Sequence, residues 1–131
     1  MYTISTEKSE LDIDMIVQYL SEDSYWAQDR TKDMIQESIN NSLCYGIYKD
    51  CKQIGFARVI TDFVVFGWLL DVFILPGYQG CGVGKYLLKA IMEDEKLINV
   101  KRWRLATADA HGFYEQFGFK SPANPEYIME K

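Results

Sequence analysis

Apolar and polar side chains alternate along several short segments of the chain, and this period of two predicts β-strands. Near the N-terminus, Tyr2 and Ile4 alternate with Thr3 and Ser5, which is the pattern of an edge strand. Residues 68–75 are apolar on both faces, as is typical of a strand in the centre of a sheet. The predicted strands are residues 2–5, 43–48, 54–60, 68–75 and 102–106, with a last strand over residues 127–129.

Between these strands, apolar residues recur at three- and four-residue intervals, which predicts amphipathic helices. The predicted apolar faces are Leu11, Met15, Ile16, Tyr19 and Leu20 in the first helix, and Met34, Ile35, Ser38 and Ile39 in the second. Thr31 is expected to cap the second helix. The third helix covers residues 85–93, and its buried stripe is expected to be Val83, Leu87, Ile91 and either Tyr86 or Ala90. The fourth begins near Ala110 and ends at Gly118, a typical C-terminal glycine.

The composition is that of one ordinary globular domain, which we expect to span residues 1–131. Of these residues, 48% are hydrophobic and 25% are charged, so the chain can bury a core. The net charge of −5 argues against a nucleic-acid partner and mildly favours a cationic partner such as an amine. No segment resembles a signal peptide or a membrane span, so we expect a cytoplasmic protein without a membrane partner. A homodimer remains open.

The three cysteines are Cys44, Cys51 and Cys81. Because their number is odd and none forms a Cys-x-x-Cys pair, we expect neither a disulfide framework nor a metal site.

Three glycines at alternate positions, Gly80, Gly82 and Gly84, lie between the predicted central strand and the third helix. Glycine has no Cβ atom, so backbone amides in this segment can approach a ligand closely. The first turn of a helix also carries unpaired N–H groups and a partial positive charge. We therefore expect the segment to bind a phosphate or pyrophosphate group.

Two well-known phosphate loops do not fit this spacing. A Walker A loop needs Gly-x-x-x-x-Gly-Lys followed by Ser or Thr, but here Tyr86 follows Gly84-Lys85 and Gln79 stands in the first glycine position. The dinucleotide loop needs Gly-x-Gly-x-x-Gly and an acid about 20 residues further on, but residues 100–101 are not acidic. Both alternatives are excluded.

The pattern Gln79-x-x-Gly82-x-Gly84 resembles the acyl-coenzyme A (acyl-CoA) loop of the GNAT superfamily of N-acetyltransferases, which reads Gln/Arg-x-x-Gly-x-Gly/Ala. Residues 110–119, AHGFYEQFGF, resemble the later GNAT motif Ala-x-x-Phe-Tyr-x-x-x-Gly-Phe. Two motifs in this order, about 30 residues apart, are more specific than either alone. The resemblance implies a mixed α/β (α+β) fold whose central, mostly antiparallel mixed sheet is flanked by helices.

The resemblance also implies that acetyl-CoA is the acyl donor and that no metal takes part. The loop amides would bind the pyrophosphate, with Gln79 ordering the loop and Lys85 adding charge. The pantetheine arm would lie beside the open edge of the strand that ends near Ile74, where a backbone N–H would polarise the thioester carbonyl. The residues expected to bind acetyl-CoA are Phe73, Ile74, Gln79, Gly80, Cys81, Gly82, Val83, Gly84, Lys85, Thr107 and Tyr114.

One acid, Asp71, interrupts the apolar central strand, and an unpaired carboxylate there would cost several kcal/mol. If the preceding hairpin is symmetric about the bond between Val64 and Val65, Arg58 lies opposite Asp71. One interpretation is therefore a cross-strand ion pair. The other, which the resemblance suggests, is that Asp71 acts as a base or docking charge for an incoming amine. The two interpretations are compatible.

Three further residues are candidates for the chemistry. In the GNAT family, the tyrosine of the later motif commonly gives its proton to the departing thiolate, and Tyr114 occupies that place; its alternative role is core packing. His111, the only histidine, is either a base near the acetyl group or a solvated residue of the first helical turn. Thr107 stands where the family frequently has an asparagine, and it offers a hydroxyl in place of an amide.

The resemblance places the acceptor beside the first pair of helices and their connection, so Tyr25 and Trp26 are either acceptor contacts or core residues. The function expected is direct transfer of the acetyl group of acetyl-CoA to a primary amine, on a small molecule or a protein. The alternatives are a non-catalytic acyl-CoA sensor or scaffold, and an acyltransferase that uses a longer acyl-CoA.

Overall fold

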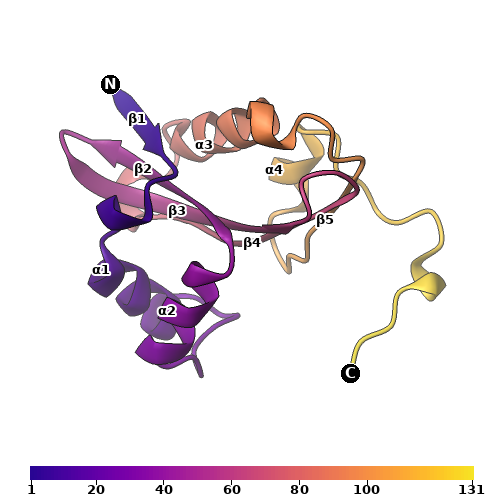
Figure 1. Ribbon diagram of the computed structural model, residues 1–131, viewed down its shortest axis with the longest axis horizontal. Coiled ribbons are helices and arrows are strands. Elements are labelled where there is room, and N and C mark those ends of the chain that lie inside the picture. Colours follow the sequence, from indigo (N-terminus) through magenta and orange to yellow (C-terminus); the bar gives the residue numbers. More distant parts are fainter.

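A five-stranded sheet organises the computed structural model, which describes residues 1–131. The strands are β1 (Tyr2–Ser5), β2 (Leu43–Lys49), β3 (Lys52–Thr61), β4 (Phe66–Ile74) and β5 (Arg102–Arg104), and they lie in this order across the sheet. The helices are α1 (Ile13–Gln18), α2 (Lys32–Asn40), α3 (Val83–Met92) and α4 (His111–Glu115). Helices α1 and α2 lie on one face of the sheet, and α3 and α4 lie on the other (Figure 1).

The sheet is antiparallel from β1 to β4, whereas β5 runs parallel to β4. Strand β5 pairs with β4 at only three positions, Phe66, Gly67 and Trp68. The rest of β4, from Leu69 to Ile74, has no strand beside it on that side. The predicted mixed, mostly antiparallel sheet is therefore confirmed, and β5 is shorter than the expected strand over residues 102–106.

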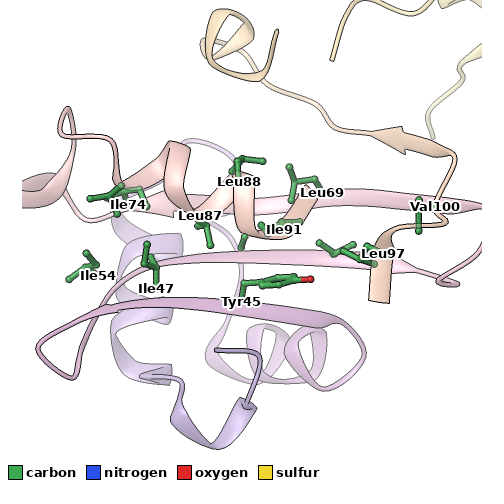
Figure 2. Close-up of a cluster of buried hydrophobic side chains, with 13 residues drawn as sticks. Tyr45, Ile47, Ile54, Leu69, Ile74, Leu87, Leu88, Ile91, Leu97 and Val100 are labelled. Carbon is green, nitrogen blue, oxygen red and sulfur yellow. The ribbon is translucent and has the colours of Figure 1, made fainter. Parts of the chain in front are cut away.

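The larger core lies between α3 and the sheet. Figure 2 shows Leu87 and Ile91 of α3 over Tyr45 and Ile47 of β2. The buried stripe of α3 is completed by Leu88, and neither Tyr86 nor Ala90 takes that place. The buried members of this stripe are Val83, Leu87, Leu88 and Ile91. The prediction was wrong at the fourth position because Tyr86 is 49% exposed and packs edge-on against Tyr2 at the side of the helix.

The second core lies under α1 and α2 and contains Ile16, Leu20, Ile35, Ile39, Cys44, Phe56 and Phe73. The predicted first helix is interrupted, because α1 passes into a π-helical turn over Tyr19–Asp23. The side chain of Thr31 accepts a hydrogen bond from the Met34 amide, which confirms it as the cap of α2. No helix has the length and apolar composition needed to cross a membrane.

The C-terminal segment differs from its prediction. Residues 127–129 form no strand, and the segment instead contains a short 3₁₀ turn, Pro125–Tyr127. Figure 1 shows this end of the chain extending away from the sheet. Residues 120–131 are all exposed, so the apolar run over residues 127–129 has no neighbouring strand to pair with. The fourth helix also ends earlier than expected, at Glu115, although Gly118 does adopt the left-handed conformation, with φ 90°.

The closeness of β3 and β4 allows a test of the packing at Gly55. A methyl group on Gly55 would lie 2.8 Å from the Phe73 carbonyl oxygen and 2.6 Å from Cδ1 of Ile74. We expect Gly55→Ala to lower the free energy of unfolding by about 1–3 kcal/mol, because the backbone must move to admit the methyl group. Urea denaturation measures the change. The control is Gly77→Ala, where a Cβ would meet nothing within 4 Å; equal effects at both positions would contradict the packing argument.

Candidate functional site

The glycine-rich loop has the backbone conformation that its sequence suggests. Gly80 and Gly82 have φ of 78° and 86°, a region that residues with a Cβ rarely adopt. A Cβ atom at either position would meet nothing within 4 Å, so the backbone conformation, and not close packing, favours glycine there. Gly84 differs, because its Cβ position lies 3.4 Å from the ring of Phe113 on α4. Gly84 therefore allows α4 to approach the start of α3.

The loop is attached to the end of β4 and opens directly into α3. The side-chain amide of Gln79 donates a 2.8 Å hydrogen bond to the carbonyl of Ile74. Helix α3 begins at Val83, two residues earlier than expected, and the carbonyl of Gly82 accepts its first hydrogen bond from Tyr86. No carbonyl of the chain accepts a bond from the amides of residues 83–85. These free N–H groups at a helix start form a cradle for an anion.

Two adjoining cavities lie along the open part of β4. The loop cavity, of about 590 Å³, is lined by β4, the glycine loop and α4, and includes Phe73, Ile74, Gln79 and Lys85. The sheet cavity, of about 450 Å³, lies between β4 and the segment that follows β5, and includes Trp68, Leu70, Leu105 and Thr107. The residues that line both cavities are Tyr25, Trp26, Val72, Asp109, Ala110 and Tyr114. A ligand extending from one cavity into the other would pass these side chains.

Asp71 lies in a β-bulge of β4. Phe56 of β3 pairs with Phe73 of β4, and Arg58 of β3 pairs with Leu70 of β4. The two positions are two residues apart on β3 but three residues apart on β4. Arg58 is therefore opposite Leu70, and the predicted register was wrong by one residue because the bulge adds a residue. Asp71 adopts a left-handed backbone, with φ 55°, which aspartate tolerates better than most residues. The predicted ion pair is nevertheless confirmed, since Nε of Arg58 lies 2.8 Å from Oδ2 of Asp71.

The Asp71 carboxylate has two further partners, which the sequence did not suggest as a set. Trp26 donates from Nε1 to Oδ1 over 2.9 Å. Arg30 donates from Nη1 to both oxygens, each over 2.9 Å. The Asp71 side chain is only 1% exposed, so both oxygens are shielded and fully engaged. This geometry favours a structural ion pair over a general base, because a base needs a free lone pair within reach of the acceptor's proton.

Arg30 was missed because no local pattern connects it to Asp71. It lies 41 residues away in an irregular segment between the π-helical turn and α2, where no period gives a face. The only indication in the sequence was that a buried Asp71 carboxylate needs hydrogen-bond donors, and this need does not identify which residues supply them.

Tyr25 bridges two loops above the junction of the cavities. Its hydroxyl accepts a 2.8 Å hydrogen bond from the backbone amide of Ala108, which follows β5. Its ring meets Trp26 edge-on, with centroids 5.0 Å apart. Tyr25 and Trp26 thus both line the sheet cavity, where the acceptor was expected.

Tyr114 occupies the junction itself. Burial raises its pKa to about 12, and the nearby Tyr25 and Asp109 act in the same direction. Its hydroxyl has no hydrogen-bond partner within the chain, and no buried polar side-chain atom is unpaired, so this hydroxyl is open to the cavities. Tyr114 therefore keeps its proton at neutral pH and presents it to a bound ligand.

The remaining candidates lie at different distances from the junction. His111 is exposed at the start of α4 and lines neither cavity. The Thr107 hydroxyl accepts bonds from the amides of Asp109 and Ala110, so it caps the approach to α4 and faces only the sheet cavity. Val83 is buried in the larger core. The Cys81 thiol donates to the Tyr78 carbonyl over 3.1 Å.

No cluster of three or more His, Cys, Asp or Glu side chains has metal-binding geometry.

Comparison with known proteins agrees with this architecture. The family model of the acetyltransferase (GNAT) domain matches residues 40–121. The chain belongs to the GNAT acetyltransferase family. A Gibberella zeae protein assigned as an acetyltransferase is 33% identical to this GNAT domain in an alignment of 140 positions that covers 91% of this chain and 79% of the relative.

Solved structures show the same fold. A protein assigned to the GNAT family from Xanthomonas campestris pv. campestris superposes with a TM-score of 0.97 at 43% identity. The match covers 100% of this chain and 92% of the Xanthomonas chain. A Clostridium acetobutylicum protein classed as an acetyltransferase, whose structure includes acetyl-CoA, has a TM-score of 0.73 at 14% identity. It covers 100% of this chain and 96% of its own, and at that identity it shows the fold alone.

The cluster around Asp71 predicts a large effect of removing its charge. We expect Asp71→Asn to lower the free energy of unfolding by about 3–5 kcal/mol, because two arginines then lose their only counter-charge while the shape is kept. Asparagine also tolerates the left-handed backbone, so strain does not confound the urea denaturation. The control is Asp14→Asn, whose pair with Lys32 is exposed and contributes about 1 kcal/mol or less. A loss at Asp71 no greater than at Asp14 would refute the argument.

Proposed function

We propose that this GNAT domain transfers the acetyl group of acetyl-CoA to a primary amine. The observation that carries the proposal is the meeting of two cavities at Tyr114, with the glycine loop lining one of them. A related fold has been solved with acetyl-CoA, which supports the choice of donor.

The residues of the loop cavity fit coenzyme A. Gly80 and Gly82 leave open space above free amides, and Lys85 lines the same cavity, so a pyrophosphate would meet both donors and positive charge. From there, Phe73 and Ile74 lead along the open part of β4, where the amide-bearing pantetheine arm can bond to main-chain groups. This direction brings the thioester end towards Tyr114.

At the junction, residues of the chain supply a proton and polarise a carbonyl. Acetyl-CoA provides a thioester, whose C–S bond breaks as the acceptor nitrogen forms the new C–N bond. Tyr114, which holds its proton, gives it to the departing sulfur. The attacking nitrogen releases its surplus proton to solvent, and Tyr114 recovers one from solvent. Main-chain amides of β4 near Ile74 polarise the carbonyl. The sheet cavity, with Tyr25 and Trp26, receives the acceptor.

Neither residue predicted as a base is available at the junction, and Asp109, the carboxylate that does border both cavities, is exposed to solvent. Both oxygens of Asp71 are engaged, and His111 lies outside the cavities. The acceptor therefore loses its ammonium proton to solvent before attack. A consequence is that the rate rises with pH as the acceptor amine deprotonates.

Removing the Tyr114 hydroxyl tests the proposed chemistry. We expect Tyr114→Phe to lower kcat for thiol release with an amine panel about 100-fold or more, which is the usual contribution of a positioned acid. The wild-type rate should not fall near pH 10, where an unperturbed tyrosine ionises, because the pKa of Tyr114 is raised to about 12. The matched control is Tyr86→Phe, which loses the hydroxyl of a half-exposed tyrosine outside both cavities.

Three outcomes would favour another function. Tight acetyl-CoA binding without thiol release for any amine would indicate a sensor or scaffold. An unchanged rate in Tyr114→Phe would remove the assigned proton donor. Faster turnover with a longer acyl-CoA in competition would identify a different acyltransferase.

The glycine loop can be tested separately from the chemistry. We expect Gly82→Ala to weaken coenzyme A binding about tenfold or more by calorimetry, because the new methyl group enters the open space above the amides. The positive φ of 86° should cost only about 1–2 kcal/mol of stability, so the fold survives. Gly77→Ala serves as the control, and equal affinity in both variants would place the pyrophosphate elsewhere.

A further inference from the structure

Arg30 uses only part of its guanidinium to hold Asp71. Nη1 donates to both carboxylate oxygens, while Nε and Nη2 have no acceptor in the chain. Because no buried polar side-chain atom lacks a partner, these two nitrogens are accessible. The Arg30 side chain is 24% exposed and lines the sheet cavity. Nε and Nη2 form one edge of the planar guanidinium, the edge that matches the two oxygens of a carboxylate.

The charge around this edge is positive. Arg30 and Arg58 share a single buried acid, Asp71, so the cluster carries one uncompensated positive charge. For a ligand in the sheet cavity, this local positive charge matters more than the net charge of −5 of the whole chain. The reason is that salt screens distant surface charges over about 8–10 Å. A second cation, such as the far amine of a polyamine, would be repelled at this end of the cavity.

The opposite charge lies at the other end. Asp109 is the only acid besides Asp71 among the residues that line the sheet cavity, and together with Tyr114 it also borders the loop cavity. An amine would therefore find its favourable potential at the junction and an anion at Arg30. The intervening wall is apolar and aromatic, and includes Trp68, Leu70 and Leu105.

Building on the proposed function, we propose that the acceptor is a primary amine that also carries a carboxylate, as a free amino acid does. The carboxylate binds to Nε and Nη2 of Arg30, and the nitrogen lies at the junction beside Tyr114. An apolar side group packs against the wall that contains Trp68. Arg30 is in this view a specificity-determining residue, and Asp71 positions it by holding Nη1.

Matched pairs of acceptors that differ only in the carboxylate test this assignment. Phenylalanine is compared with phenethylamine, and tyrosine with tyramine, by thiol release and by mass of the acetylated product. We expect kcat/KM to be about tenfold or more higher for the member with the carboxylate, the factor that corresponds to about 1.4 kcal/mol. Each acceptor is assayed at a pH that differs from the pKa of its own amine by the same amount. The fraction of unprotonated amine is then equal for both members of a pair.

Substitution of Arg30 then locates the effect. We expect Arg30→Gln to raise KM for the amino acid about tenfold or more while KM for acetyl-CoA stays the same, and Arg30→Lys to restore part of the loss. In Arg30→Gln, Asp71 keeps Arg58 and Trp26 as donors, and a thermal melt verifies that the variant is folded. The control is Lys32→Gln, which removes a nearby exposed charge outside both cavities.

The outcomes separate this inference from the proposed function. If the amines without a carboxylate are acetylated equally well or better, the acceptor class is wrong while acetyl transfer stands. If acetyl-CoA binds but no amine is acetylated, the proposed function fails, and calorimetry with phenylalanine on the coenzyme A-loaded protein tests the subsite directly. Binding that Arg30→Gln weakens would support the subsite, and no heat with the wild-type protein would overturn it.

Discussion

A single carboxylate, that of Asp71, determines how the parts of this domain that line the sheet cavity are arranged. It lies in the bulge of β4 and accepts bonds from Arg58 on β3 and from Trp26 and Arg30 in the segment before α2. A charge shielded from water must be matched by donors, so these three groups cannot move independently. The irregular strand, its neighbour and the wall of the sheet cavity are thereby fixed by one interaction.

The arrangement of the loop cavity depends on backbone geometry instead of charge. Gly80 and Gly82 turn the chain, Gln79 ties it to the end of β4, and α3 begins at once with free amides. The short pairing with β5 leaves most of β4 open alongside. The two halves of the site are thus built by different means and converge only at Tyr114 and its neighbours. With this separation, substitutions in the wall of the sheet cavity can leave the glycine loop unchanged.

The sequence predicted the elements whose signals are local. The apolar patterns of β1 to β4, the spacing of Leu87 and Ile91, the cap at Thr31 and the glycine loop each depend on neighbouring residues, and each appears in the structure. The bulge at Asp71 and the contact of Arg30 depend on residues brought together from far along the chain, and no period encodes them. Residues 127–129 were predicted to form a strand but have no partner in this fold, which shows that a short apolar run alone is not sufficient. The site was therefore predictable where it consists of one segment, and only partly where three segments meet.

The link between the Tyr25 hydroxyl and the amide of Ala108 has a consequence for the movement of ligands. It joins two loops that line the sheet cavity by one neutral hydrogen bond, whose net contribution is about 1 kcal/mol. Thermal motion breaks such a bond frequently without disturbing the sheet beneath. A ligand can thus enter and leave when these two loops part. The ionic cluster around Asp71 and the hydrophobic cores on either side of the sheet stay intact.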